Sequence, residues 1–177
     1  MTAGSFEFDP KKMLGVLAEH RVDFVLIGGV AATLHASPFV TYDVDICPAP
    51  DHDNLRRLQE ALEELDARIR VTDEPEPARI NFLPRVIEAA PFLNLVTKWG
   101  PLDIVHRPAA SEGYADLVRN AIRIRLGDLE LTVASRADVL RSKETLYRDK
   151  DVATVRVLRE LEERELQDRP RRSRGKP

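Results

Sequence analysis

Asp43 and Asp45 are the residues whose type and spacing most directly suggest chemistry in this sequence. They fall in a predicted strand, residues 42–47, where side chains alternate between the two faces, so both carboxylates leave one face roughly 6.5–7 Å apart along the backbone. Val44 and Ile46 point the other way, toward the core. Two carboxylates directed away from an apolar layer suit a hard divalent cation such as Mg²⁺, which prefers oxygen ligands, including phosphate oxygens. The same pattern also fits two ordinary surface acids.

Gly28 and Gly29 lie at the junction of a predicted strand, residues 22–27, and a predicted helix, residues 30–36. Without a Cβ, backbone can approach a ligand closely, and the first N–H groups of a helix are available to an anion. A tight bend would also explain the pair. Because the P-loop and Rossmann glycine patterns are both absent, neither of those nucleotide-binding folds is supported.

Asp103 is a third candidate, flanked by Leu102 and Ile104 in a predicted strand, residues 102–106. If this strand neighbours the strand of Asp43 and Asp45, three carboxylates form a cluster. Like charges at that range require a cation or a raised pKa, and two metal ions about 3.5–4 Å apart would satisfy all three. The alternative is a partly exposed acid on an edge strand.

The elements that must position these residues alternate between helices and strands. Hydrophobic periodicity, caps and turn residues predict helices at 10–20, 30–36, 51–65, 85–89, 135–147 and 149–165. Strands are predicted at 22–27, 42–47, 68–71, 79–83, 93–98, 102–106, 122–126 and 129–133, with hairpins over 93–106 and 122–133. The expected fold is α/β (α+β), a mixed sheet flanked by helices. Residues 1–168 are expected to form one domain, with the sheet within about 22–133 and C-terminal helices within about 135–166.

Charge is unevenly distributed along the 177 residues. Subtracting 30 acidic from 27 basic residues gives a net charge of −3, and residues 169–177 alone contribute five positive charges, so residues 1–168 carry −3 − 5 = −8. We expect 169–177 to be a basic, disordered tail. A single cysteine, Cys47, excludes an intramolecular disulfide and a multi-thiolate zinc site, which favours a cytoplasmic location. No apolar run is long enough to predict a membrane segment.

Taken together, these motifs resemble the nucleotidyltransferase superfamily related to DNA polymerase beta, and most closely the AbiEii- and MenT-type nucleotidyltransferase toxins and their relatives. The resemblance spans about residues 22–156. The segments that carry it are Ile27-Gly28-Gly29-Val30-Ala31-Ala32, His35, Thr41-Tyr42-Asp43-Val44-Asp45-Ile46, Asp103, and Lys143 with Arg148-Asp149-Lys150-Asp151.

The resemblance implies a role for each matching residue around the metal. Gly28 and Gly29 would hold the nucleotide phosphates. Asp43 and Asp45 would bind two Mg²⁺ ions, or Mn²⁺ in their place. Asp103 would complete the metal site and help to activate the attacking hydroxyl.

Three further residues would support the nucleotide. Thr41 would steady the metal-binding loop, and Lys143 would neutralise triphosphate charge with Asp151 anchoring it. The second glycine of the motif is often serine in the family, so Gly29 costs this chain one hydroxyl.

The implied reaction transfers a nucleoside monophosphate from an NTP to an acceptor hydroxyl. For a toxin of a toxin–antitoxin pair, the acceptor would be tRNA or another RNA, and a cognate antitoxin would be the protein partner. One alternative is a small-molecule nucleotidyltransferase of the aminoglycoside-modifying type, because a body of charge −8 suits a polycationic acceptor. A second is a noncatalytic nucleotide-binding or antitoxin-like protein, against which the three intact aspartates argue.

Overall fold

A mixed seven-stranded sheet in the order β3-β4-β5-β2-β1-β7-β6 forms the centre of the protein. The computed structural model describes residues 8–71 and 76–168. The strands are β1 (Phe24–Ile27), β2 (Val44–Pro48), β3 (Arg68–Ile69), β4 (Phe92–Thr97), β5 (Gly100–Val105), β6 (Ile122–Leu126) and β7 (Leu129–Val133). The mixed sheet with flanking helices confirms the predicted fold class.

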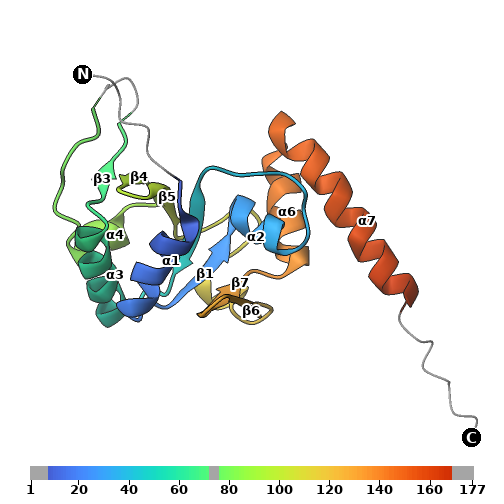
Figure 1. Cartoon of the computed structure of the whole chain (residues 1–177), viewed down its shortest axis with the longest axis horizontal. Helices are drawn as coiled ribbons and strands as arrows, with labels where there is room; N and C mark the ends of the chain where they lie inside the picture. Colours follow the sequence, from blue (N-terminus) through green and yellow to red (C-terminus); the bar gives the residue numbers. More distant parts are fainter. Residues whose placement is uncertain (1–7, 72–75, 169–177) are drawn as a thin grey trace, which may run out of the picture.

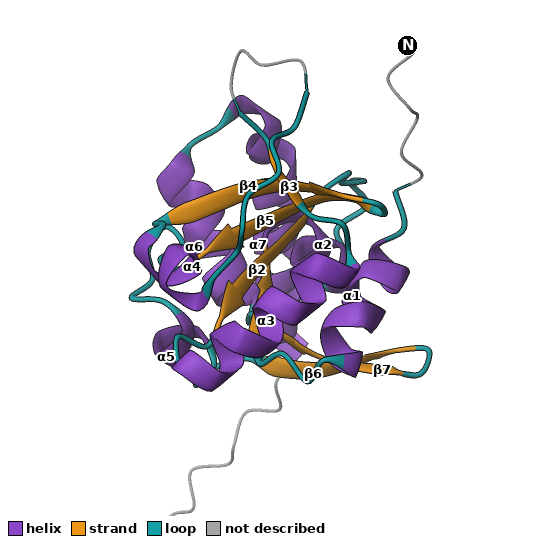
Figure 2. Cartoon of the chain, turned by 90° about the vertical axis from the view of Figure 1, so that its left-hand side faces the viewer, coloured by secondary structure: helices purple, strands orange, loops and turns teal. Residues whose placement is uncertain are grey.

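Helices cover both faces of this sheet (Figures 1 and 2). One face carries α1 (Pro10–Glu19), α3 (His52–Glu64) and α4 (Pro84–Ala89). The other carries α2 (Gly28–Leu34), with α6 (Arg136–Leu146) packed beside α2 and α7 (Val152–Asp168) on the outer side of α6. Two short elements complete the fold, α5 (Tyr114–Leu117) and a 3₁₀ turn, η1 (Asp149–Asp151).

Local capping explains where the main helices begin. The Asp9 carboxylate accepts a hydrogen bond from the Lys12 backbone amide at 3.0 Å, and Pro10 occupies the first turn of α1. Asp51 caps α3 through the Asn54 amide at 2.9 Å, and Ser135 caps α6 through the Asp138 amide at 3.1 Å. These side chains satisfy N–H groups that have no partner within the helix.

Strand β2 lies at the centre of the sheet and positions the candidate site. It pairs antiparallel with β1 and parallel with β5, and the second pairing sets Asp45 opposite Asp103. Val44 and Ile46 are fully buried, as their alternation predicts. Two-residue periodicity therefore leaves Asp45 on the opposite face from these core side chains.

Several boundaries differ from those predicted. β2 begins at Val44 rather than at residue 42, so Asp43 immediately precedes the strand. The helix expected over 30–36 begins at Gly28, the last helix is preceded by the η1 turn, and α5 was not predicted.

The strand predicted over residues 79–83 is wrong. Only Ala78 pairs there, in a single bridge to Ile69, and Phe82 is the one buried side chain between 79 and 83. The segment forms no ladder because β3 is itself only two residues long and Pro84 starts α4 two residues after Phe82. The predicted tail, 169–177, lies outside the described residues. Among the described residues, none of the helices combines the length and the apolar character needed to cross a bilayer.

Candidate active site

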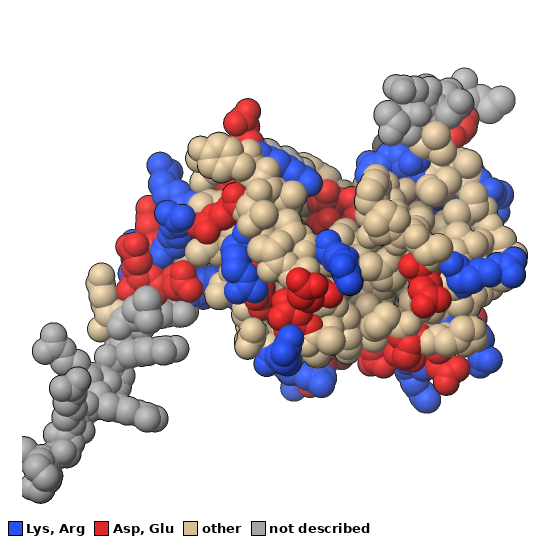
Figure 3. Space-filling view, turned by 180° about the vertical axis from the view of Figure 1, so that it is seen from behind, with Lys and Arg blue, Asp and Glu red and all other residues tan. Residues whose placement is uncertain are grey.

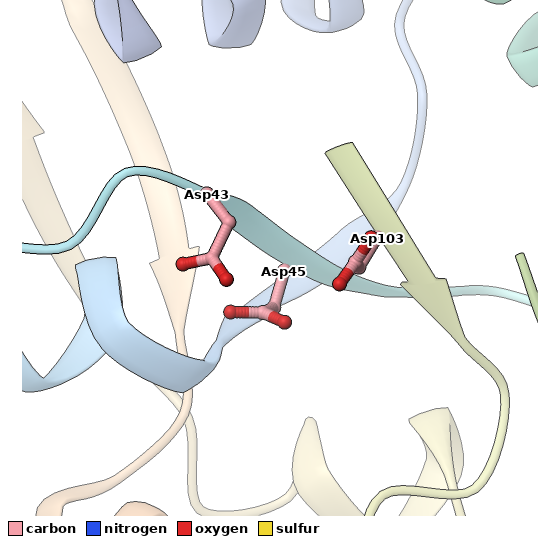
Figure 4. Close-up of side chains that lie close together, drawn as sticks. All are labelled: Asp43, Asp45 and Asp103. Carbon is pink, nitrogen blue, oxygen red and sulfur yellow. The ribbon is translucent and has the colours of Figure 1, made fainter. Parts of the chain in front are cut away.

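Three carboxylates converge where β2 and β5 run side by side (Figure 4). Asp43, Asp45 and Asp103 each offer an oxygen within 4.8 Å of the others. Asp45 and Asp103 are register partners on adjacent parallel strands, so their side chains share one face. The structure therefore brings Asp103 into the cluster that the sequence left conditional on strand order.

Two glycines and one threonine fit tightly around this cluster. Gly28 has φ +67°, and a Cβ built there would lie 2.0 Å from Oδ2 of Asp45. A Cβ on Gly29 would lie 2.5 Å from Oγ1 of Thr41, whose hydroxyl donates a hydrogen bond to Asp43. Only glycine leaves room for Asp45 at the first position, and at the second the Thr41 hydroxyl fills the space that a serine side chain would need.

Burial and mutual repulsion raise the pKa of Asp45 to about 7. Desolvation is the largest cause, followed by the negative charges of Asp43 and Asp103. The Gly29 amide and the Lys143 ammonium oppose the shift but do not cancel it. The cluster therefore concentrates negative charge and offers only oxygen donors, which fits Mg²⁺ or Mn²⁺.

Lys143 and Asp151 form an ion pair on the α6 side of the site. Their side chains are only 13% and 8% exposed, so the pair is largely shielded from water. Both line the same cleft as the aspartates. The structure thus brings together all eight residues selected from the sequence: Gly28, Gly29, Thr41, Asp43, Asp45, Asp103, Lys143 and Asp151.

Sequence reasoning missed Arg70 and Asn94, which extend the site toward the edge of the sheet. Asn94 on β4 is the register partner of Asp103, and the Arg70 amide donates to the Asn94 carbonyl at 2.8 Å. Nη2 of Arg70 lies 3.6 Å from Oδ1 of Asp103. A polar residue within the apolar 93–98 run, opposite Asp103 in a predicted hairpin, was the available signal for Asn94.

The cleft around these residues has a volume of about 1080 Å³. Besides the three clustered aspartates, its described charged residues are Arg70, Arg107, Asp138, Arg141, Lys143, Arg148 and Asp151. Asp138 pairs with Arg141, and Asp151 pairs with Lys143. On the face shown in Figure 3, acidic and basic side chains are interspersed, so the acidic excess of the chain is not concentrated there in one continuous patch.

Solved structures similar to this chain include three proteins of related chemistry. One is TM1012 of Thermotoga maritima, assigned as a nucleotidyltransferase, with 17% identity, a TM-score of 0.51, and coverage of 86% of this chain and 90% of that one. The lincosamide antibiotic adenylyltransferase LnuA, solved with lincomycin bound, has 16% identity, a TM-score of 0.55, and coverage of 86% and 98%. The antibiotic-resistance factor ANT(2'')-Ia has 12% identity, a TM-score of 0.52, and coverage of 88% and 90%.

At these identities the likeness establishes a shared fold, the nucleotidyltransferase fold. No protein-family model matches the sequence, and no curated protein matches it.

Proposed function

We propose that this protein is a metal-dependent nucleotidyltransferase that transfers a nucleoside monophosphate from an NTP to an acceptor hydroxyl. The observation that carries the proposal is the convergence of Asp43, Asp45 and Asp103 beside the Gly28 turn, within a cleft large enough for a nucleotide and an acceptor. The shared fold supports it.

In this proposal Asp43, Asp45 and Asp103 hold the metal. Bound there, Mg²⁺ or Mn²⁺ would stabilise charge on the entering and leaving oxygens of the phosphoryl transfer. Thr41 holds Asp43 in place through its hydroxyl. The tight turn at Gly28 keeps the Asp45 carboxylate against the start of α2.

The nucleotide would occupy the side of the cleft formed by Gly28, Gly29 and α6. Lys143, which is paired with Asp151 and lines the cleft, would face the triphosphate. The acceptor oxygen attacks the α-phosphorus, the α–β bridging bond breaks, and pyrophosphate leaves. Asp103 lies on the remaining side, where its carboxylate can receive the hydroxyl proton.

Two classes of acceptor are compatible with this reaction. A toxin of a toxin–antitoxin pair would modify tRNA or another RNA in the cytoplasm and would be held by a cognate antitoxin, as the sequence resemblance implies. The fold shared with LnuA and ANT(2'')-Ia favours an antibiotic as the second candidate. A noncatalytic role is disfavoured because the structure keeps all three carboxylates in contact range.

Label transfer tests the proposal directly. The protein is incubated with Mg²⁺, each α-labelled NTP, and either total RNA or a panel of aminoglycosides and lincosamides. We expect label on one acceptor class with the wild type and none with the Asp43→Ala/Asp45→Ala variant. Absence of transfer from all four NTPs to every acceptor would refute the proposed function.

A further inference from the structure

A row of polar side chains crosses three strands of the sheet and ends just beyond a fourth, on the floor of the cleft. Asp45, Asp103 and Asn94 are successive register partners on β2, β5 and β4, and Arg70, just after β3, follows Asn94. All four line the cleft. The first two belong to the metal cluster, so Asn94 and Arg70 continue the site toward the edge strand.

This edge is the side of the carboxylate cluster that the proposed nucleotide position leaves open. Gly28, Gly29 and Lys143, assigned above to the triphosphate, come from α2 and α6. Arg70 and Asn94 come from the opposite part of the sheet order, beyond β5. An acceptor that attacks in line, from the side away from the leaving pyrophosphate, would therefore lie over β5, β4 and Arg70.

The chemistry of this region is basic and aromatic. The Arg70 side chain is 50% exposed although its guanidinium lies 3.6 Å from Asp103. Phe92, two residues before Asn94, is 58% exposed and lines the cleft, and Arg107, two residues beyond the end of β5, lines it as well. Alternation along β4 and β5 places Phe92, Asn94 and Asp103 on one face.

No described acid of the cleft is available to bind a polycation. Outside the metal cluster, the described lining contains only Asp138 and Asp151, and each has a cationic partner within the same cleft. Two divalent cations, as proposed above, would more than balance the three carboxylates, so Asp103 would no longer need Arg70 as its counterion. The guanidinium would then be available as a donor to a phosphate oxygen of the acceptor.

From these observations we infer that Arg70, Asn94 and Phe92 form an acceptor subsite for a nucleotide that carries a phosphate next to its attacking hydroxyl, as at the 3′ end of an RNA. Arg70 binds the phosphate, the Asn94 amide hydrogen-bonds the sugar or phosphate, and Phe92 stacks on the base. This inference rests on the proposed function and selects RNA over a cationic antibiotic as the acceptor.

Binding of a fluorescent single-stranded RNA with a free 3′ hydroxyl tests the subsite without requiring catalysis. Anisotropy is measured with Mg²⁺ and a non-hydrolysable NTP analogue, for the wild type, Arg70→Ala and Arg68→Ala. Arg68 is the matched control because it lies two residues away, pairs with Asp66 and is outside the cleft lining. We expect Arg70→Ala to weaken binding about tenfold and to lower the salt dependence by about one ion, and Arg68→Ala to match the wild type.

A kinetic comparison distinguishes two roles of Arg70, binding of the acceptor phosphate and neutralisation of the Asp103 charge. A dinucleoside monophosphate and the corresponding nucleoside serve as acceptors, the second lacking the phosphate. We expect Arg70→Ala to raise KM about tenfold for the dinucleotide alone. The inference would be overturned if Arg70→Ala raised KM equally for both acceptors, or if it changed mainly the Mg²⁺ concentration that the reaction needs. It would also be overturned if the protein did not bind RNA, or if Arg70→Ala left RNA binding unchanged.

The two proposals fail in different ways. Transfer to an antibiotic only, with no RNA binding, would refute the acceptor subsite and leave the nucleotidyltransferase proposal standing. RNA binding that depends on Arg70, without transfer from any NTP, would refute the enzyme and leave the subsite standing.

Discussion

Replacing Asp45 by asparagine should stabilise the metal-free protein, and more so at higher pH. The pKa of Asp45 is about 7 in the fold against an ordinary value of 3.8. Between these values the folded state binds more protons than the unfolded state, so this group lowers stability progressively as pH rises from about 4 to 7. Asn keeps the shape of the side chain and removes the charge, so the variant escapes that loss.

The magnitude follows from the two pKa values. Three pKa units correspond to about 4 kcal/mol in total, of which about 2 to 3 kcal/mol develops between pH 5 and pH 8. The advantage of Asp45→Asn over the wild type in EDTA should grow by that amount across the interval. For a chain of this size, this equals a relative gain in Tm of about 5 to 10 °C.

Thermal unfolding at pH 5 and pH 8, with EDTA or with Mg²⁺, measures the effect. Asp128→Asn, an exposed aspartate in the β6–β7 turn, is the matched control and should show no such change with pH. Added Mg²⁺ should stabilise the wild type at pH 8 and have little effect on Asp45→Asn. A difference between wild type and Asp45→Asn that is the same at both pH values would refute the reasoning that burial and the neighbouring carboxylates destabilise the ionised form of Asp45.

Three further outcomes are expected. Gly28→Ala should cost more than about 2 kcal/mol of stability in chemical denaturation, because φ is +67° and the Cβ meets Asp45, whereas Gly15→Ala, with open space around its Cβ in α1, should gain about 0.5–1 kcal/mol; equal effects would contradict this. Lys143→Met should cost about 3 kcal/mol of stability, because it leaves Asp151 buried without its cation, and Lys143→Met/Asp151→Leu should recover most of that loss in the same assay. A double variant as unstable as Lys143→Met would show that the loss does not come from the unpaired Asp151. Mg²⁺ affinity should fall up to about tenfold per pH unit below pH 7, with proton release on binding seen by calorimetry; an affinity independent of pH would argue against Asp45 as a ligand.

The central part of the site was predictable because its signals are local. The alternation around Asp43 and Asp45 and the glycine pair before α2 lie in short, strongly patterned segments. Whether Asp103 joined them depended on one fact of topology, the parallel pairing of β5 with β2, which the sequence leaves open. The resemblance supplied the expectation, and the register confirms that the three residues lie together.

The edge of the cleft at Arg70 and Asn94, which we propose binds the acceptor, could not be predicted in the same way. Arg70 reaches the site only because β3 pairs with β4 in one register, and residues 68–71 carry little pattern of their own. The strand predicted over residues 79–83 was wrong for the same reason, since pairing at a sheet edge depends on partners that are distant in sequence. The net charge of −8 for residues 1–168 describes the whole body and not the cleft, whose described lining outside the three aspartates has five basic and two acidic residues.

The row from Asp45 to Arg70 spans three strand spacings, roughly 14 Å, and runs from the central strand of the sheet, β2, to the edge strand β3. Asp45 and Asp103 lie on strands paired on both sides, whereas Arg70 follows an edge strand of two residues. Substitutions at the edge should therefore cost little stability, while bulky or apolar replacements at the centre should disturb the packing of β2 and β5 as well as the carboxylate cluster. If Arg70 and Asn94 bind the acceptor as we propose, acceptor preference could be changed by substitutions at this rim of the sheet without altering the carboxylate cluster.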